Sequence, residues 1–128
     1  MSRIINISTQ SEEIDLELGR YRIFVLGGFG VNLGKFSISF RNKATSEITK
    51  SEKAFWPVQT FAFGKRAKRI FIVDISEAGK YEVLFNKPEA LKVKPSNLPI
   101  SSFFSDFLST DKIEIVITKK LGIFPILA

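Results

Sequence analysis

The side chains that most often carry out catalysis are scarce in this chain. It contains no cysteine and no histidine, which excludes thiolate nucleophiles, disulfides and the commonest general base and metal ligand. Among the carboxylates that remain, Asp74 interrupts the apolar run Ile70–Ile75, which otherwise suits a strand covered on both faces. A buried Asp74 would have a raised pKa; alternatively, it ends a strand and accepts hydrogen bonds from the following turn. No second carboxylate accompanies it as a glycosidase would need, so we expect no enzyme activity, no metal and no cofactor.

Four glycines between positions 27 and 34 precede Lys35, and this spacing suggests a phosphate-binding loop. A Walker-type loop needs glycine at position 29 and a hydroxyl residue at position 36, and phenylalanine stands at both. Phosphate loops also lead into a helix, whereas the alternation after Gly34 predicts a strand. We therefore interpret the segment as a turn that joins two antiparallel strands. Phe29 within it is a candidate contact for a partner or a membrane; the alternative is a side chain folded back into the core.

The positive charge of the chain is concentrated in one region. The formal net charge is +6, and residues 35–70 hold nine basic and two acidic side chains. The density is greatest in the segment GKRAKR, predicted to be a turn between two strands, whose basic members are Lys65, Arg66, Lys68 and Arg69. Repulsion among them favours binding of an anion. The alternative is a solvated hairpin tip that keeps the sheet edges from pairing with other chains.

Aromatic residues lie directly upstream of this basic segment, in FWPVQTFAF at residues 55–63. Aromatic rings beside lysine and arginine are used to bind single-stranded nucleic acid, because the rings stack on bases. The single tryptophan, Trp56, suits that role, or contact with a sugar ring or a lipid headgroup. Phe61 and Phe63 share one strand face and are predicted to point into the core.

Alternation of apolar and polar residues is the dominant pattern along the chain. It is clear at Ile14–Leu18, Lys35–Phe40 and Lys112–Thr118, and it is typical of half-buried antiparallel strands. Turn residues separate about eight such runs. At 128 residues the chain fits one domain, and we predict a single all-β domain over 1–128. It should be a two-sheet antiparallel β-sandwich, jelly-roll-like, with at most one short helix near 101–108.

A short pattern occurs twice, sixty positions apart. Glu17–Tyr21 and Glu77–Tyr81 each contain a glycine, a basic residue and a tyrosine in succession, and they account for both tyrosines in the chain. Glycine in a turn supplies backbone conformations that other residues avoid. We interpret the two segments as equivalent corners of the sandwich; internal duplication is the alternative.

The sequence predicts a non-catalytic β-sandwich module for binding or assembly, with a protein, glycan or anionic membrane partner at the basic 35–70 region. The alternative is a nucleic-acid-binding domain; a barrel around an apolar ligand would rest only on the thirteen phenylalanines. The apolar C-terminal segment Leu121–Ala128 should dock on its own domain or on a second subunit, giving a homo-oligomer. The N-terminus resembles no signal peptide, and no apolar run reaches membrane-helix length, so a cytoplasmic location is expected.

Overall fold

The structure is a computed structural model that describes residues 2–9, 11–28, 30–54, 58–62, 64–94 and 108–119. The strands within these residues form three antiparallel sheets. Sheet A contains, in spatial order, β1 (Ser2–Asn6), β12 (Glu114–Thr118), β3 (Gly19–Leu26), β9 (Lys65–Ile75) and β7 (Glu52–Lys53), and β8 (Gln59–Ala62) also pairs with β9. Sheet B contains β2 (Ser11–Leu16), β10 (Gly79–Asn86), β5 (Ser37–Asn42) and β6 (Ile48–Lys50). Sheet C is the short pair β11 (Lys92–Lys94) and β4 (Gly30–Asn32).

Two short 3-10 helices, η1 (Pro88–Ala90) and η2 (Thr110–Lys112), complete the described elements. In the part of the chain that the structure describes, no helix is long and apolar enough to cross a membrane. The helix predicted near residues 101–108 lies outside the described residues except for Leu108, which is in coil.

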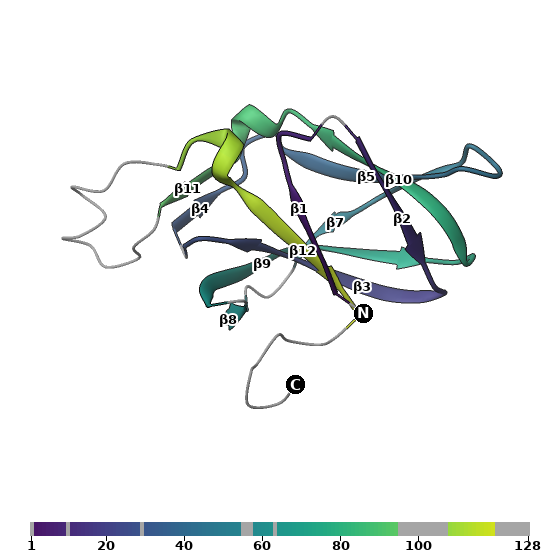
Figure 1. Ribbon diagram of the computed structural model, residues 1–128, viewed down its shortest axis with the longest axis horizontal. Coiled ribbons are helices and arrows are strands. Elements are labelled where there is room, and N and C mark those ends of the chain that lie inside the picture. Colours follow the sequence, from purple (N-terminus) through teal and green to yellow (C-terminus); the bar gives the residue numbers. More distant parts are fainter. Residues whose placement is uncertain are drawn as a thin grey trace.

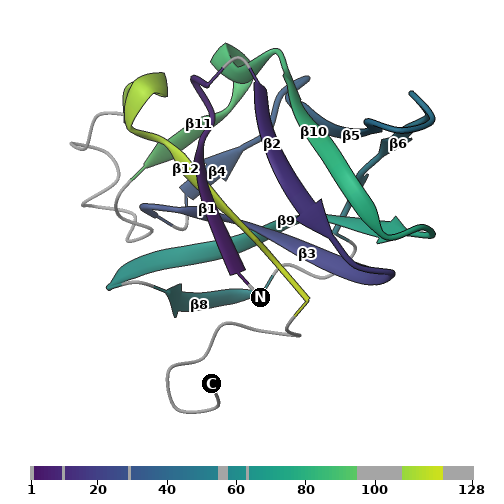
Figure 2. The same ribbon diagram turned by 45° about the vertical axis from the view of Figure 1, so that its right-hand side comes forward.

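Sheets A and B are the two layers of a β-sandwich (Figures 1 and 2). Eight strands form its framework: β1, β2, β3, β5, β6, β9, β10 and β12. When these eight strands are numbered 1 to 8 along the chain, their spatial order is 1-8-3-6 in sheet A and 2-7-4-5 in sheet B. Because this interleaved order is that of a jelly roll, the predicted jelly-roll-like sandwich is confirmed. Sheet C, β7 and β8 are short additions to it.

The alternation seen in the sequence places the core between the two layers. Ile38 and Phe40 of β5 are fully buried, whereas the serine between them is only half-buried. From the opposite layer, Ile23 and Val25 of β3 and Ile115 of β12 join the same apolar cluster. Burying one face of each strand fixes its register, because a shift by one residue would expose the whole apolar set.

A β-bulge explains the nearly continuous apolar run in β9. The pairing of β9 with β3 skips Ile70, so that Ile70 and Phe71 both pack into the core. On the other side of the strand, Ile72 is half-buried and Asp74 is exposed. The expectation that this run is covered on both faces is therefore wrong beyond the bulge.

Two arches carry the chain between the layers at one end of the sandwich (Figure 1). One leads from β2 to β3 through Gly19, and the other leads from β9 to β10 through Gly79. The arches are neighbours, because β2 pairs with β10 and β3 pairs with β9. They hold the two copies of the pattern repeated in the sequence.

A tyrosine hydroxyl closes each arch. The amide of Glu17 donates a hydrogen bond to Tyr21 Oη at 2.8 Å, and Tyr81 Oη donates to the carbonyl of Glu77 at 2.6 Å. Each bond reaches back four residues, and both tyrosines are buried. Tyr81 also accepts a 3.4 Å hydrogen bond from the buried amide of Asn42. The repeated pattern thus marks two equivalent corners, as predicted.

Reciprocal ion pairs join the two arches. Arg20, which follows Gly19, donates to both carboxylate oxygens of Asp74 at 2.8 and 3.2 Å. Lys80, which follows Gly79, lies 3.5 Å from the carboxylate of Asp15. Each arch therefore supplies a cation to an aspartate of the strand beside it. Asp74 is neither buried nor bonded to the following turn, and the hydrogen bond from Arg20 lowers its pKa.

Replacing Tyr81 with phenylalanine should lower the free energy of unfolding by about 1–2 kcal/mol, because the buried amide of Asn42 and the partly buried carbonyl of Glu77 lose their partner. Urea unfolding measures this change. Ser39→Ala, on the outer side of sheet B, is the matched control and should change stability by less than about 0.5 kcal/mol. A Tyr81→Phe effect no larger than that of the control would contradict the role given to the hydroxyl.

The ion pair between Arg20 and Asp74 predicts a pH-dependent contribution to stability. Because the folded-state pKa of Asp74 is lowered, the contribution is complete above the unfolded-state pKa of about 3.9 and is lost as the pH falls through the folded value. The stability difference between wild type and Asp74→Asn should therefore shrink from pH 6 to pH 2. It should be small throughout, since both side chains are exposed and screened by salt. A difference that stays constant in urea unfolding at both pH values contradicts this assignment.

Candidate functional site

The basic segment lies in a strand and not in a turn, so the sequence prediction for its backbone is wrong. The turn is confined to Gly64, which adopts a positive φ of 75°, and β9 begins at Lys65. Strand β9 is paired on both sides here, with β3 and with β8. Ala67 is the fully buried member of the segment and packs with Phe24 on the outer side of sheet A. One small apolar residue and two neighbouring strands are enough to hold the basic residues in extended form.

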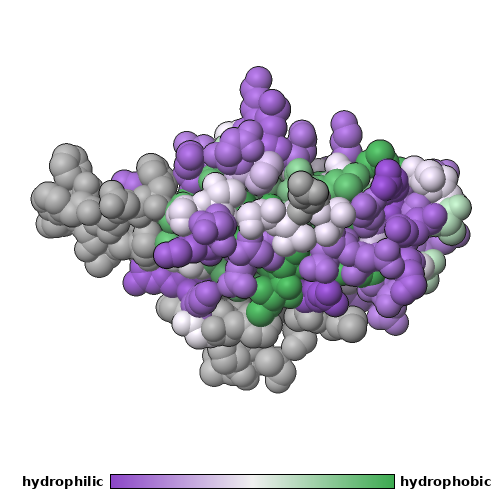
Figure 3. Space-filling model, turned by 45° about the horizontal axis from the view of Figure 1, so that its top comes forward, coloured by the Kyte–Doolittle hydropathy of each residue, from purple (hydrophilic) through white to green (hydrophobic). Residues whose placement is uncertain are grey.

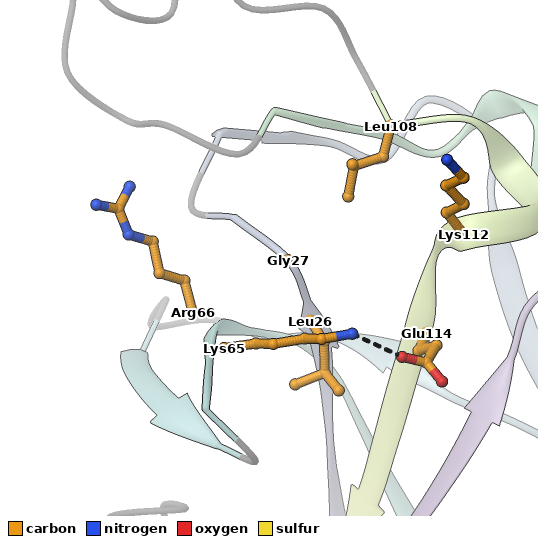
Figure 4. Close-up of a pocket in the computed structure, with 7 residues that line it drawn as sticks. All are labelled: Leu26, Gly27, Lys65, Arg66, Leu108, Lys112 and Glu114. Carbon is orange, nitrogen blue, oxygen red and sulfur yellow. Dashed lines mark hydrogen bonds and ion pairs between the residues drawn. The ribbon is translucent and has the colours of Figure 1, made fainter.

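Lys65 and Arg66 line a pocket of about 430 Å³ at the beginning of β9, which we name the basic pocket (Figure 4). Its remaining walls come from the end of β3 and from the segment that leads into β12. The lining residues are Leu26, Gly27, Lys65, Arg66, Leu108, Lys112 and Glu114. A volume of this size falls in the range of small-ligand sites.

Positive charge predominates in the basic pocket. Among the described lining residues, Lys65, Arg66 and Lys112 contribute three cations, against the single carboxylate of Glu114. Lys65 Nζ lies 3.1 Å from Glu114 Oε1, and Figure 4 shows Lys65 extended toward that carboxylate. Arg66 lies on the opposite side of the pocket from Glu114 in this view. Three cations against one carboxylate give the described lining a net positive charge that favours an anion.

Leucine side chains give the basic pocket an apolar part. Leu26 is almost fully buried, and Leu108 is half-buried. Backbone hydrogen bonds hold these walls: the amide of Gly27 donates to the carbonyl of Arg66 at 2.8 Å, and that of Leu108 donates to Val93 at 2.8 Å. Cations beside leucines suit a ligand that is anionic at one point and apolar at another.

Lys68 and Arg69 line a different pocket, which we name the second pocket. It has a volume of about 230 Å³ and is lined by Val31, Leu33, Lys53, Ala54, Lys68, Arg69 and Ile70. Burial lowers the pKa of Arg69, and the positive charge of Arg22 nearby adds to this effect. The structure therefore divides the four predicted basic residues into two pairs along one strand.

The other site residues predicted from the sequence lie outside the described residues. These are Trp56 and Phe29, together with Phe63 and the C-terminal segment Leu121–Ala128. Sequence reasoning missed Lys112 and Leu108, and it included Lys53 only as a member of the basic 35–70 region; the fold brings all three to the two pockets. Nothing in their local sequence signals this role, because each is an ordinary lysine or leucine beside a turn or in a short strand.

The glycine-rich loop leads into a strand after Gly34, as the sequence predicted. That strand is β5, which begins at Ser37, so the segment lacks the helix that a phosphate loop requires. The strands on either side, β3 and β5, belong to different sheets and are not paired, and the short strand β4 within the loop pairs with β11. The interpretation of the segment as a turn that joins two antiparallel strands is therefore wrong, because the loop joins different layers of the molecule.

Charge on the outer side of sheet B is balanced, in contrast to the basic pocket. Lys43 lies 3.0 Å from Glu13, Lys80 pairs with Asp15, and Arg41 pairs with Glu82. Hydrophilic residues cover most of the face seen in Figure 3, with smaller apolar areas between them. Among the described residues, no group of three acidic side chains is placed to hold a metal ion.

Gly27 should tolerate a side chain poorly, chiefly because of its backbone conformation. Its φ is +109°, and a Cβ atom there would lie 2.8 Å from Leu108 Cδ1. We expect Gly27→Ala to lower the unfolding free energy by roughly 2–3 kcal/mol, from backbone strain and from the clash together. Gly64→Ala is the matched control, because its φ is +75° and nothing lies within 4 Å of the added atom.

Urea unfolding should show a smaller loss for Gly64→Ala, of about 1 kcal/mol, since only strain applies there. Adding Leu108→Ala to Gly27→Ala should recover part of the loss, which a double-mutant cycle measures. Equal losses at the two glycines, with no coupling to Leu108, would contradict the close approach at this wall of the basic pocket.

The sequence matches no protein-family model, no curated protein and no solved structure. Support for any function of this chain therefore comes from its own side chains.

Proposed function

We propose that the protein is a non-catalytic β-sandwich module that binds an anionic partner at the basic pocket. One observation carries the proposal: Lys65 and Arg66 from β9 and Lys112 from η2 line one cavity with two leucines and a single carboxylate. Clustering three cations raises the free energy of the unbound protein, and a bound anion would lower it.

An acidic segment of another protein is the partner that fits this lining best. Carboxylates would pair with the lysines and the arginine, and apolar side chains would contact Leu26 and Leu108. A ligand that carries charge but no apolar group would make no apolar contact with the two leucines. A glycan or an anionic membrane surface is the alternative partner. We propose that binding occurs in the cytoplasm.

Single-stranded nucleic acid is the second candidate, and one observation favours it. The second pocket adds Lys53 and Lys68 next to the basic pocket along β9. Cations spaced along a strand suit a chain of phosphates, and binding of that kind weakens steeply with salt.

Titration of labelled probes at 25 and 250 mM salt tests the proposal. The probes are the nine-residue peptide acetyl-Glu-Leu-Glu-Leu-Glu-Leu-Glu-Leu-Glu-amide, a twelve-residue oligo-dT and phosphatidylserine vesicles. We expect the peptide to bind, and the double variant Lys65→Ser/Lys112→Ser to bind it roughly tenfold more weakly. Two lost charge contacts of about 0.5–1 kcal/mol each give a factor of that order.

The matched control is Lys35→Ser/Lys80→Ser, which removes the same charge from exposed lysines that line neither pocket. It should retain the affinity of the wild type within about twofold. Equal losses in both variants would mean that only net charge matters, and the proposed site would then be wrong. Binding of oligo-dT or vesicles alone, lost in the pocket variant, would keep the site and replace the partner.

A further inference from the structure

We infer that the basic pocket and the second pocket form one continuous binding track, which takes an extended acidic polypeptide segment with aliphatic side chains between its carboxylates. The inference rests on the proposed function and specifies its ligand. It concerns the way in which β9 connects the two pockets.

Arg66 and Lys68 connect the pockets. They stand two residues apart in β9, so their side chains leave the same side of the strand, about 6.6 Å apart. Arg66 lines the basic pocket and Lys68 lines the second pocket. Lys68 lies opposite Val25 of β3, a core residue, so this is the side of β9 that faces the interior of the sandwich.

The two pockets also share their chemistry. Among the described lining residues, the basic pocket has three cations, the second pocket has Lys53 and Lys68 on the side of β9 that faces it, and Glu114 is the one carboxylate. Each includes branched aliphatic side chains: Leu26 and Leu108 in the basic pocket, and Val31, Leu33 and Ile70 in the second. A ligand that satisfies one pocket therefore satisfies the other when the same groups recur along it.

An extended polypeptide can repeat the same carboxylates and aliphatic side chains along its length. Its residues advance by about 3.3 Å, so alternate side chains repeat at the spacing of Arg66 and Lys68. A nucleic acid would repeat its phosphates as well, but its bases bind chiefly by stacking on aromatic rings. The described residues that line the two pockets include no aromatic ring. The lining thus favours aliphatic side chains over bases.

Comparison of a long and a short probe tests the track. The nine-residue Glu-Leu peptide can span about 30 Å, whereas acetyl-Glu-Leu-amide fills one pocket at a time. For wild type, we expect the long peptide to bind at least tenfold more tightly than the short one, because its second contact is intramolecular. In Lys53→Ser/Lys68→Ser the long peptide should lose roughly tenfold, and the short one should stay within about threefold. Circular dichroism and urea unfolding establish that the variant is folded.

The outcomes separate this inference from the proposed function. An unchanged affinity of the long peptide in Lys53→Ser/Lys68→Ser overturns the track, while Lys65→Ser/Lys112→Ser still reports on the basic pocket alone. Equal affinities of wild type for the two peptides also overturn it. If oligo-dT binds in a way that depends on both pockets and the long peptide does not bind, the track is retained. The polypeptide is then the wrong ligand. Lys35→Ser/Lys80→Ser again controls for net charge.

Discussion

The paired arches between the two layers are the constraint on which the rest of the structure depends. At Gly19 and Gly79 the chain crosses from one sheet to the other, and the two crossings are neighbours because their flanking strands pair in both sheets. The hydroxyls of Tyr21 and Tyr81 hold the backbone of each arch. The crossings hold β2 beside β10 and β3 beside β9, and they fix which face of these four strands points inward.

The length of β9 links the arches to the two pockets. Near its end, Phe71, Val73 and Ile75 pack into the core, and the strand then enters the second arch. Its first residues carry the basic cluster, and the bulge at Ile70 separates the two parts. One strand is therefore apolar and inward-facing near the arches, and cationic where it begins. Because side-chain direction changes at the bulge, the same strand contributes apolar side chains to the core near the arches and basic side chains to the pockets where it begins.

The pockets lie near the end of β3 that is remote from the arches. Gly19 begins β3 in the first arch, and Leu26 ends it at the basic pocket. The arch end is held by buried tyrosines and ion pairs, whereas the other end is assembled from strand starts and connecting segments. A rigid scaffold that presents a site at the ends of its strands is the common arrangement in sandwich folds. Binding at this end would leave the arches undisturbed.

The sequence by itself determined the β-sandwich and its two corners. It also excluded the types of catalysis that need cysteine or histidine. Alternation and glycine turns are local signals, and they are legible at Ile38 and Phe40 or at Gly79. Only the tertiary structure decided that Lys65 and Arg66 share a pocket with Lys112, while Lys68 and Arg69 share another with Lys53. It also decided that the basic segment is a strand, because pairing with β3 and β8 outweighs the local preference of GKRAKR for a turn. Contacts between residues tens of positions apart depend on strand order, which no local pattern encodes.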